Sequence, residues 1–332
     1  MLAGNEISTM TKYLKYKPAW LQLVVFGSLS FGMYLTFGLV AFFGIAQFYH
    51  LSVAELQGFD FSNGSVLTAL KMLQAVLTIV IFLLPSLAFA YLSDKRPLRY
   101  IGFKPPVPAY YWWLGMLLML LAFPFASWTN QVNQNLHLPA FMKSTEEALR
   151  AAEKNANDLI AAMLDMKNPS DLVVMLFVVA LLPAICEELF FRGVLQRLFI
   201  QIFERPWTGI IVTAIIFSAF HGQFLGFLPR VLLGIILGAI YWYSGSIWPS
   251  ILAHFVNNAI QVIYVYKDRG FIDQEPRLHP VLVIFSGMAI VGILWYMRKN
   301  SHTHYGELYD TDDELILPSR ENGFDHKPED EN

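Results

Sequence analysis

Two adjacent carboxylates and an arginine lie within a long apolar segment of the sequence. Glu187, Glu188 and Arg192 fall inside the run from Leu172 to Phe203. An ionisable side chain at bilayer depth is costly unless it is paired or faces a wet cavity, so such residues indicate a functional site. On a helix, Glu188 and Arg192 share a face and can pair, whereas Glu187 points about 100° away. Glu187 is thereby free to act as a general base, and the alternative is a structural buried charge cluster.

Two histidines and an asparagine occur in neighbouring apolar runs. His221 follows Phe217 by four positions, and Asn258 follows His254 by four. A single histidine in a membrane helix is more often an interhelical hydrogen-bonding residue. Together with the glutamates, however, these residues supply what amide hydrolysis requires: a base for the attacking water, a group that orients it, and donors for the developing oxyanion.

The composition indicates a membrane protein with several spans. Hydrophobic residues make up 55% of the 332 residues and charged residues only 15%, which is outside the usual range of soluble domains. The net charge is −3, no basic domain occurs, and nothing indicates nucleic-acid binding. The single cysteine, Cys186, excludes an intramolecular disulfide. A thiol in apolar surroundings is normally inert, so we assign it no catalytic role.

The apolar runs predict an all-α bundle of about eight transmembrane helices with the site in a cavity inside the membrane. A run without formal charges, from Val231 to Tyr266, is interrupted by Ser244-Gly245-Ser246 and by Pro249, and therefore fits two helices better than one. The other six spans are expected at about Trp20–Phe48, Val66–Leu92, Tyr110–Trp128, Leu172–Phe203, Trp207–Phe224 and Val281–Tyr296.

Charge asymmetry between the loops predicts the topology. The loop from His50 to Gly64 has no lysine or arginine, whereas the loop from Ser93 to Pro106 has four. By the positive-inside rule we expect the second loop and both termini to lie in the cytoplasm. We also expect a multi-pass integral protein of a bacterial inner or plasma membrane. We divide it into a cytoplasmic segment (1–19), a transmembrane domain (20–298) and an acidic cytoplasmic tail (299–332) that we expect to be mostly disordered.

The loop between Asn130 and Ser170 contains one further helical pattern. Ser144 precedes Glu147 with capping-box spacing, which predicts a helix start. The apolar residues Leu149, Ala152, Leu159, Ile160 and Met163 share one face of this helix. We favour an amphipathic helix that rests on the membrane surface, and the alternative is a lid over the site.

The polar pairs carry a family resemblance when they are taken in order. Glu187-Glu188-x-x-x-Arg192, Phe217-x-x-x-His221 and His254-x-x-x-Asn258 resemble the three signature motifs of the CPBP family, which comprises CAAX proteases and bacteriocin-processing enzymes and is also called the Abi family. The motifs are complete and span about residues 170–266. The resemblance implies an eight-helix membrane fold and peptide-bond hydrolysis. Eukaryotic relatives, the Ras-converting CAAX endopeptidases, remove a C-terminal tripeptide from prenylated proteins.

The resemblance also implies a role for each motif residue. Glu187 is expected to activate water with the help of His221, while His254 and Asn258 stabilise the oxyanion. Glu188 and Arg192 form the supporting pair, and Phe217 packs beside the site. The expected substrate is a membrane-associated peptide or protein, for example a C-terminal, CAAX-like segment, and membrane lipid is the surrounding partner.

Three alternatives remain at this point. Zinc held by Glu187, His221 and His254 would give a metalloprotease; we favour the metal-free mechanism because the chain has no His-Glu-x-x-His motif and Glu187 can act on water directly. A catalytically silent membrane binding protein, such as a bacteriocin-immunity factor, would have no evident need for Asn258 together with Glu187, His221 and His254. A small transporter would also explain buried charges, but no inverted repeat with broken helices is visible.

Overall fold

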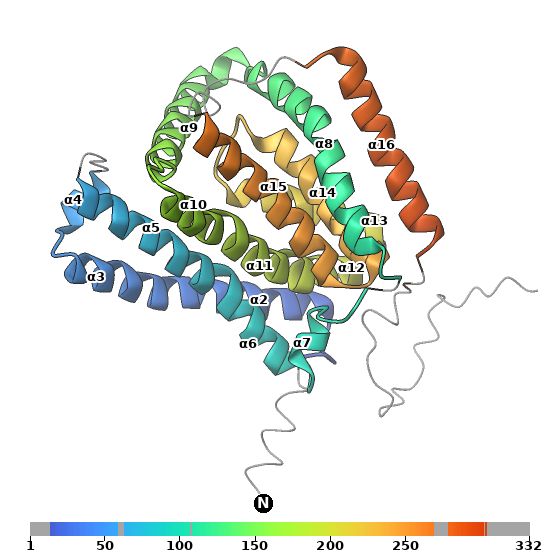
Figure 1. The fold of residues 1–332 in the computed structure, drawn as a ribbon. Helices are drawn as coiled ribbons and strands as arrows, with labels where there is room; N and C mark the ends of the chain where they lie inside the picture. Colours follow the sequence, from blue (N-terminus) through green and yellow to red (C-terminus); the bar gives the residue numbers. More distant parts are fainter. Residues whose placement is uncertain (1–13, 59–62, 107, 269–277, 302, 304–332) are drawn as a thin grey trace, which may run out of the picture.

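The computed structural model describes residues 14–58, 63–106, 108–268, 278–301 and 303, and over these ranges the chain forms helices and no strand (Figure 1). The predicted all-α fold is confirmed. Most of the predicted N-terminal segment and acidic tail lies outside the described residues. In chain order the first helices are α2 (Ala19–Met33), α3 (Leu39–Phe48), α4 (Val53–Gln57), α5 (Gly64–Thr78), α6 (Leu84–Ser93), α7 (Pro97–Tyr100) and α8 (Tyr111–Gln134). They are followed by α9 (Lys143–Met163), α10 (Pro169–Met175), α11 (Leu182–Glu188), α12 (Arg197–Phe203), α13 (Pro206–Phe220), α14 (Phe227–Ser244), α15 (Ile247–Lys267) and α16 (Pro280–Lys299).

Several of these helices join end to end into membrane-length units. Six units of the described chain are long and apolar enough to cross a membrane: Ala19–Phe48, Gly64–Ser93, Tyr111–Gln134, Pro169–Phe203, Phe227–Ser244 and Pro280–Lys299. The two remaining predicted spans are α13, which has 15 residues, and α15, which has 21 but contains several polar residues. The break between α14 and α15 is confirmed. The third span is longer than predicted and ends at Gln134 rather than Trp128, and α13 ends at Phe220 rather than Phe224.

Two of the long units contain a π-helical turn directly before a proline. The segment Leu176–Leu181 precedes α11, in which Pro183 lies in the first turn, and Ile79–Leu83 likewise precedes Pro85 in α6. A proline donates no backbone hydrogen bond and clashes with the carbonyl four residues earlier, so a wider turn at this place accommodates it. A further π-helical segment, Leu189–Gln196, joins α11 to α12. The unit that carries the glutamates is therefore irregular on both sides of them.

The unit α10–α12 lies in the middle of the bundle (Figure 1). The α11 segment contacts α5 on one side and α15 on the other. Helices α14, α15 and α16 all pack against α8, and α13 packs against α14. The glutamates are thus enclosed by helices from both halves of the chain.

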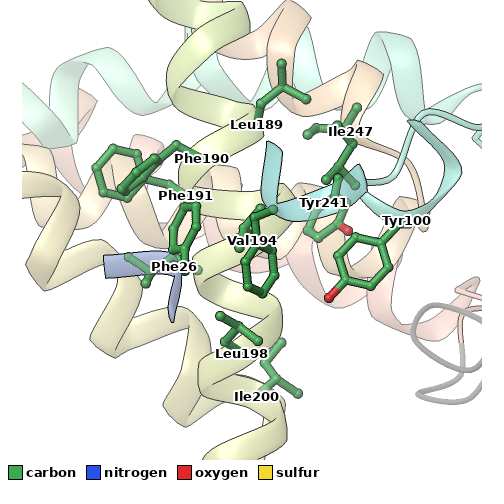
Figure 2. Packing of buried hydrophobic residues seen from close by; sticks show 14 of the residues in the cluster. Phe26, Tyr100, Leu189, Phe190, Phe191, Val194, Leu198, Ile200, Tyr241 and Ile247 are labelled. Atoms are coloured by element: carbon green, nitrogen blue, oxygen red, sulfur yellow. The ribbon is translucent and has the colours of Figure 1, made fainter. Parts of the chain in front are cut away.

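The largest apolar cluster surrounds the segment that follows the glutamates, as Figure 2 shows. Phe190 packs against Phe26 of α2 with 4.7 Å between ring centroids and 43° between ring planes, and Phe191 meets Phe217 of α13 edge to face at 5.1 Å. Burial of such rings is a main source of core stability. Because this packing holds Leu189–Gln196 from several sides, the adjacent glutamates are fixed in orientation.

The loop after α6 is attached to the turn between α14 and α15. Ile247 donates its N–H to the carbonyl of Gly102 at 3.0 Å, and Gly102 has a φ of +94°. A Cβ at Gly102 would lie 2.8 Å from the ring of Tyr241, so both the backbone conformation and the space favour glycine. Arg197 is buried, and its guanidinium carbon lies 3.7 Å from the ring centroid of Tyr100.

The amphipathic helix is present as α9, but its predicted capping box is wrong. The helix begins at Lys143 after a 3-10 turn, so Ser144 lies inside the first turn and the N-cap residue, Met142, makes no side-chain hydrogen bond. Glu146 fixes this end of the helix instead: it contacts His137 at 2.8 Å and Arg150 at 2.9 Å. These contacts and the N–H of Leu138 lower the pKa of Glu146 to about 2. The carboxylate therefore stays charged at neutral pH.

Candidate active site

Glu188 and Arg192 form the predicted ion pair. Glu188 Oε1 lies 2.9 Å from an Arg192 guanidinium nitrogen, and both side chains are fully buried. Arg192 also donates to the carbonyl of Gly234 in α14 at 3.2 Å. A buried charge pair of this kind is tolerated when other hydrogen bonds satisfy its remaining groups.

Two residues of α15 also donate to Glu188. His254 Nδ1 lies 2.9 Å from Glu188 Oε1, and the Ser250 hydroxyl donates to Oε2. Ser250 was not predicted from the sequence. It precedes His254 by four positions, as Asn258 follows it by four, so one face of α15 presents Ser250, His254 and Asn258 in successive turns.

Glu187 faces the other nitrogen of the same imidazole. Its Oε2 lies 3.9 Å from His254 Nε2, and its side chain is 13% exposed. This separation is too long for a direct hydrogen bond. Glu187 Oε2 is buried and has no hydrogen-bond partner among the described protein atoms. His254 thus lies between the two carboxylates, and the predicted difference in orientation between Glu187 and Glu188 is present.

The ring of Phe217 contacts both histidines and the arginine. Its centroid is 4.9 Å from that of His221, 5.9 Å from that of His254, and 4.8 Å from the Arg192 guanidinium carbon. The last distance is in the range of a cation–π interaction. Phe217 therefore brings the second motif against the first and the third.

His221 lies directly after α13 rather than within it. The helix ends at Phe220, and Gly222 turns the chain with a φ of +65°. His221 Nδ1 is 2.9 Å from the carbonyl oxygen of Phe217. Because a carbonyl oxygen only accepts hydrogen bonds, Nδ1 carries a proton, and Nε2 of the neutral ring is the acceptor.

Asn258 lies one turn beyond His254 on α15 and is half-buried. Its Oδ1 accepts a hydrogen bond from Asn257 Nδ2 at 3.1 Å. This contact orients the amide and leaves Asn258 Nδ2 as a donor. The structure therefore brings Glu187, Glu188, Arg192, Phe217 and His254 together, with His221 and Asn258 at the edge of the group.

Cys186 is fully buried although it is adjacent to Glu187 in sequence. We expect Cys186→Ala to retain the full activity of the wild-type protein, since an inaccessible thiol in apolar packing is not a nucleophile. Initial rates of peptide cleavage by the two proteins would test this expectation. A loss of activity without a loss of folded protein would assign the thiol a role in the reaction.

The described residues contain no group of three or more His, Cys, Asp or Glu side chains arranged to hold a metal ion. Glu187, His221 and His254 are therefore not grouped as a metal-ligand set among the described residues.

The helices and the buried polar site define a polytopic α-helical membrane protein with a candidate hydrolytic centre inside the bundle. Residues 169–260 match the sequence model of the family described as Type II CAAX prenyl endopeptidase Rce1-like. Over this segment the match confirms the resemblance predicted from the three motifs, to the CAAX proteases of the CPBP family, and this family indicates a protease. The matched segment runs from the first residue of α10 into α15 and contains all seven motif residues. Comparisons with curated proteins and with solved structures found no match.

Proposed function

We propose that this protein is an intramembrane endopeptidase in which Glu187 activates the attacking water. The arrangement of His254 between two carboxylates carries this proposal. Glu187 Oε2 is unpartnered and 3.9 Å from His254 Nε2, so a water admitted between them during the reaction would contact both a base and a second polar group. The match to a protease family supports hydrolysis of a peptide bond.

In this mechanism Glu187 takes a proton from water, and the hydroxide attacks the scissile carbonyl. When the tetrahedral intermediate collapses, the C–N bond breaks and the protonated Glu187 gives its proton to the leaving amine. His221 assists through its Nε2, which the hydrogen bond from Nδ1 to Phe217 leaves as an acceptor. His254 and Asn258 donate to the oxyanion. This role requires His254 Nε2 to carry a proton, and the carboxylates of Glu188 and Glu187 lie on the two sides of the ring, 2.9 Å from Nδ1 and 3.9 Å from Nε2.

Glu188, Arg192 and Ser250 support the reaction without contacting the substrate. They fix the Nδ1 side of His254, which determines where its Nε2 points. A displacement of about 1 Å in a catalytic group can cost about 100-fold in rate, so we expect the contacts that hold His254 in place to be needed for full activity.

We place both ends of the described chain on the cytoplasmic side of the membrane. Lys15 lies 3.6 Å from Asp94 at the start of the positively charged loop, and Ser301 donates to the carbonyl of Tyr243 near the end of α14. The turn after α14 is in turn attached to Gly102 of that loop. These contacts support a common side for both ends, and the positive-inside rule favours the cytoplasm.

The substrate we propose is a membrane-associated peptide segment, such as a CAAX-like C-terminus. A comparison of peptides in membranes that contain the wild-type protein or Glu187→Gln would identify it. Uncleaved precursors should accumulate only with the variant. Identical peptide populations from equal amounts of the two proteins would contradict cleavage that depends on Glu187; if neither protein cleaves any peptide, the chain is a catalytically silent binding protein.

We propose that hydrolysis proceeds without zinc, because the histidines and Glu187 are not arranged as a ligand set. Purified protein is expected to contain less than about 0.1 zinc per chain and to keep its activity after chelation, whereas a catalytic zinc is bound stoichiometrically. Elemental analysis together with cleavage rates before and after chelator treatment provides the measurement. Stoichiometric zinc with activity that the chelator abolishes would establish the metalloprotease alternative.

A further inference from the structure

The loop between α13 and α14, residues 221–226, begins with His221 and is held by side chains of other helices. Leu225 donates its N–H to Glu153 Oε2 of α9 at 2.6 Å. Asn133 of α8 donates to the carbonyl of Phe224 at 2.8 Å and accepts from the N–H of Leu228 at 3.0 Å. Backbone groups of a connecting loop are thus satisfied by specific side chains rather than by solvent.

Gln223 provides a second connection between this loop and α9. Its amide nitrogen donates to Asn157 Oδ1 at 3.1 Å, and its amide oxygen accepts from the Arg230 guanidinium. Arg230 of α14 also donates to the carbonyl of Gln223 at 3.2 Å. The loop is therefore attached to α8, α9 and α14, and α9 contributes through two residues one turn apart.

Glu153 is a buried carboxylate whose hydrogen bond holds the loop 221–226 in place. It is only 6% exposed although α9 is mostly polar, and Asn133 is 2% exposed. The predicted apolar face of α9 is not uniformly buried, since Met163 is buried but Ala152 and Ile160 are exposed on the protein. A hydrogen bond with a charged partner is about twice as strong as a neutral one, so the contacts made by Glu153 and by Arg230 are the strong attachments of the loop.

On the basis of the proposed function, we infer that Glu153 is a positioning residue for His221. The His221 ring is held on one side by the carbonyl of Phe217, at the end of α13. Its own backbone begins the loop that Glu153 fixes four residues later. Through Glu153, helix α9 thereby keeps Nε2 of His221 directed at the attacking water, in addition to any contact that α9 makes with the membrane surface.

Three substitutions of Glu153 and one control test this inference. Glu153→Ala removes the acceptor of the Leu225 N–H, Glu153→Asp withdraws it by one methylene, and Glu153→Gln keeps an uncharged acceptor in reach. Asp158→Ala removes an exposed carboxylate from the same helix and serves as the matched control. Each is measured with a synthetic peptide that spans a cleavage site identified from precursors accumulating with Glu187→Gln.

We expect kcat to fall about 10-fold in Glu153→Ala, less in Glu153→Asp, and by no more than about threefold in Glu153→Gln and Asp158→Ala, with KM little changed. Amide hydrogen exchange of residues 221–226 should become faster in Glu153→Ala and stay unchanged in Asp158→Ala. Since exchange needs no substrate, it can also be measured in the Glu187→Gln background. If Glu153→Ala does not fold, Glu153→Asp provides the same comparison.

Two results would overturn the inference. Faster amide hydrogen exchange of residues 221–226 with unchanged kcat would mean that the position of His221 does not depend on the contact between Glu153 and the loop. Equal losses of kcat in Glu153→Ala and Glu153→Gln without faster exchange would mean that Glu153 acts through its charge. Full activity of Glu187→Gln would instead overturn the proposed function, so the two failures are distinguishable.

Discussion

Glu187→Gln is expected to lower the cleavage rate by about 10³-fold or more, because general-base catalysis contributes about 10²- to 10⁴-fold and an amide cannot accept the proton of the water. The substitution is nearly isosteric. Glu187 makes no ion pair as short as that of Glu188, and its Oε2 lies 3.9 Å from His254 Nε2. The variant should therefore insert and fold as the wild-type protein does, and single-turnover cleavage in detergent or liposomes provides the measurement.

A matched control for this substitution is Glu204→Gln, which alters an exposed glutamate at the end of α12. It should cleave at the wild-type rate. Equal rates for Glu187→Gln and the wild-type protein would exclude Glu187 as the base. A large loss with an altered unfolding temperature would point instead to a structural role for the carboxylate.

The contacts of the motif residues follow from sequence spacing to a large extent. Four-residue spacing on a helix predicts the Glu188–Arg192 pair and places Asn258 one turn beyond His254, and both features are present. The apolar runs predict the spans because the bilayer sets their length and backbone hydrogen bonding requires helices. These rules are local, so a single sequence suffices for them.

Contacts between distant segments could not be derived in the same way. Ser250 meets Glu188 across 62 residues of sequence, and a serine in a membrane span is too common to indicate such a contact. The π-helical turns before Pro183 and Pro85 were also missed, since a widened turn leaves the apolar composition unchanged. The capping-box pattern occurs at Ser52 as well as at Ser144, and only at Ser52 does it cap a helix. A local pattern shows what a residue can do, and the neighbouring segments determine whether it does so.

Glu188→Gln is expected to lower the free energy of unfolding by about 3 kcal/mol, the lower end of the cost of breaking a buried ion pair. The sequence alone predicts this loss of stability, because the substitution leaves the Arg192 charge in the bundle without a carboxylate partner. The structure adds a catalytic effect, because Glu188 also accepts from His254 Nδ1 and from Ser250. Cleavage should therefore fall as well, even below the unfolding temperature of the variant. Thermal unfolding in detergent and cleavage rates at a low temperature separate the two effects.

The double variant Glu188→Gln/Arg192→Met separates two effects of losing Glu188: the loss of stability caused by the unpaired Arg192 charge, and the loss of activity caused by a displaced His254. It removes the arginine charge that the single variant leaves uncompensated, and replacement of a whole buried pair is often nearly neutral. We expect most of the lost stability to return while cleavage stays low, because an amide still faces His254 Nδ1. A double variant no more stable than Glu188→Gln would show that the unpaired Arg192 charge is not the cause of the lost stability. A double variant that regains wild-type cleavage would show that the carboxylate of Glu188 is not needed to position His254.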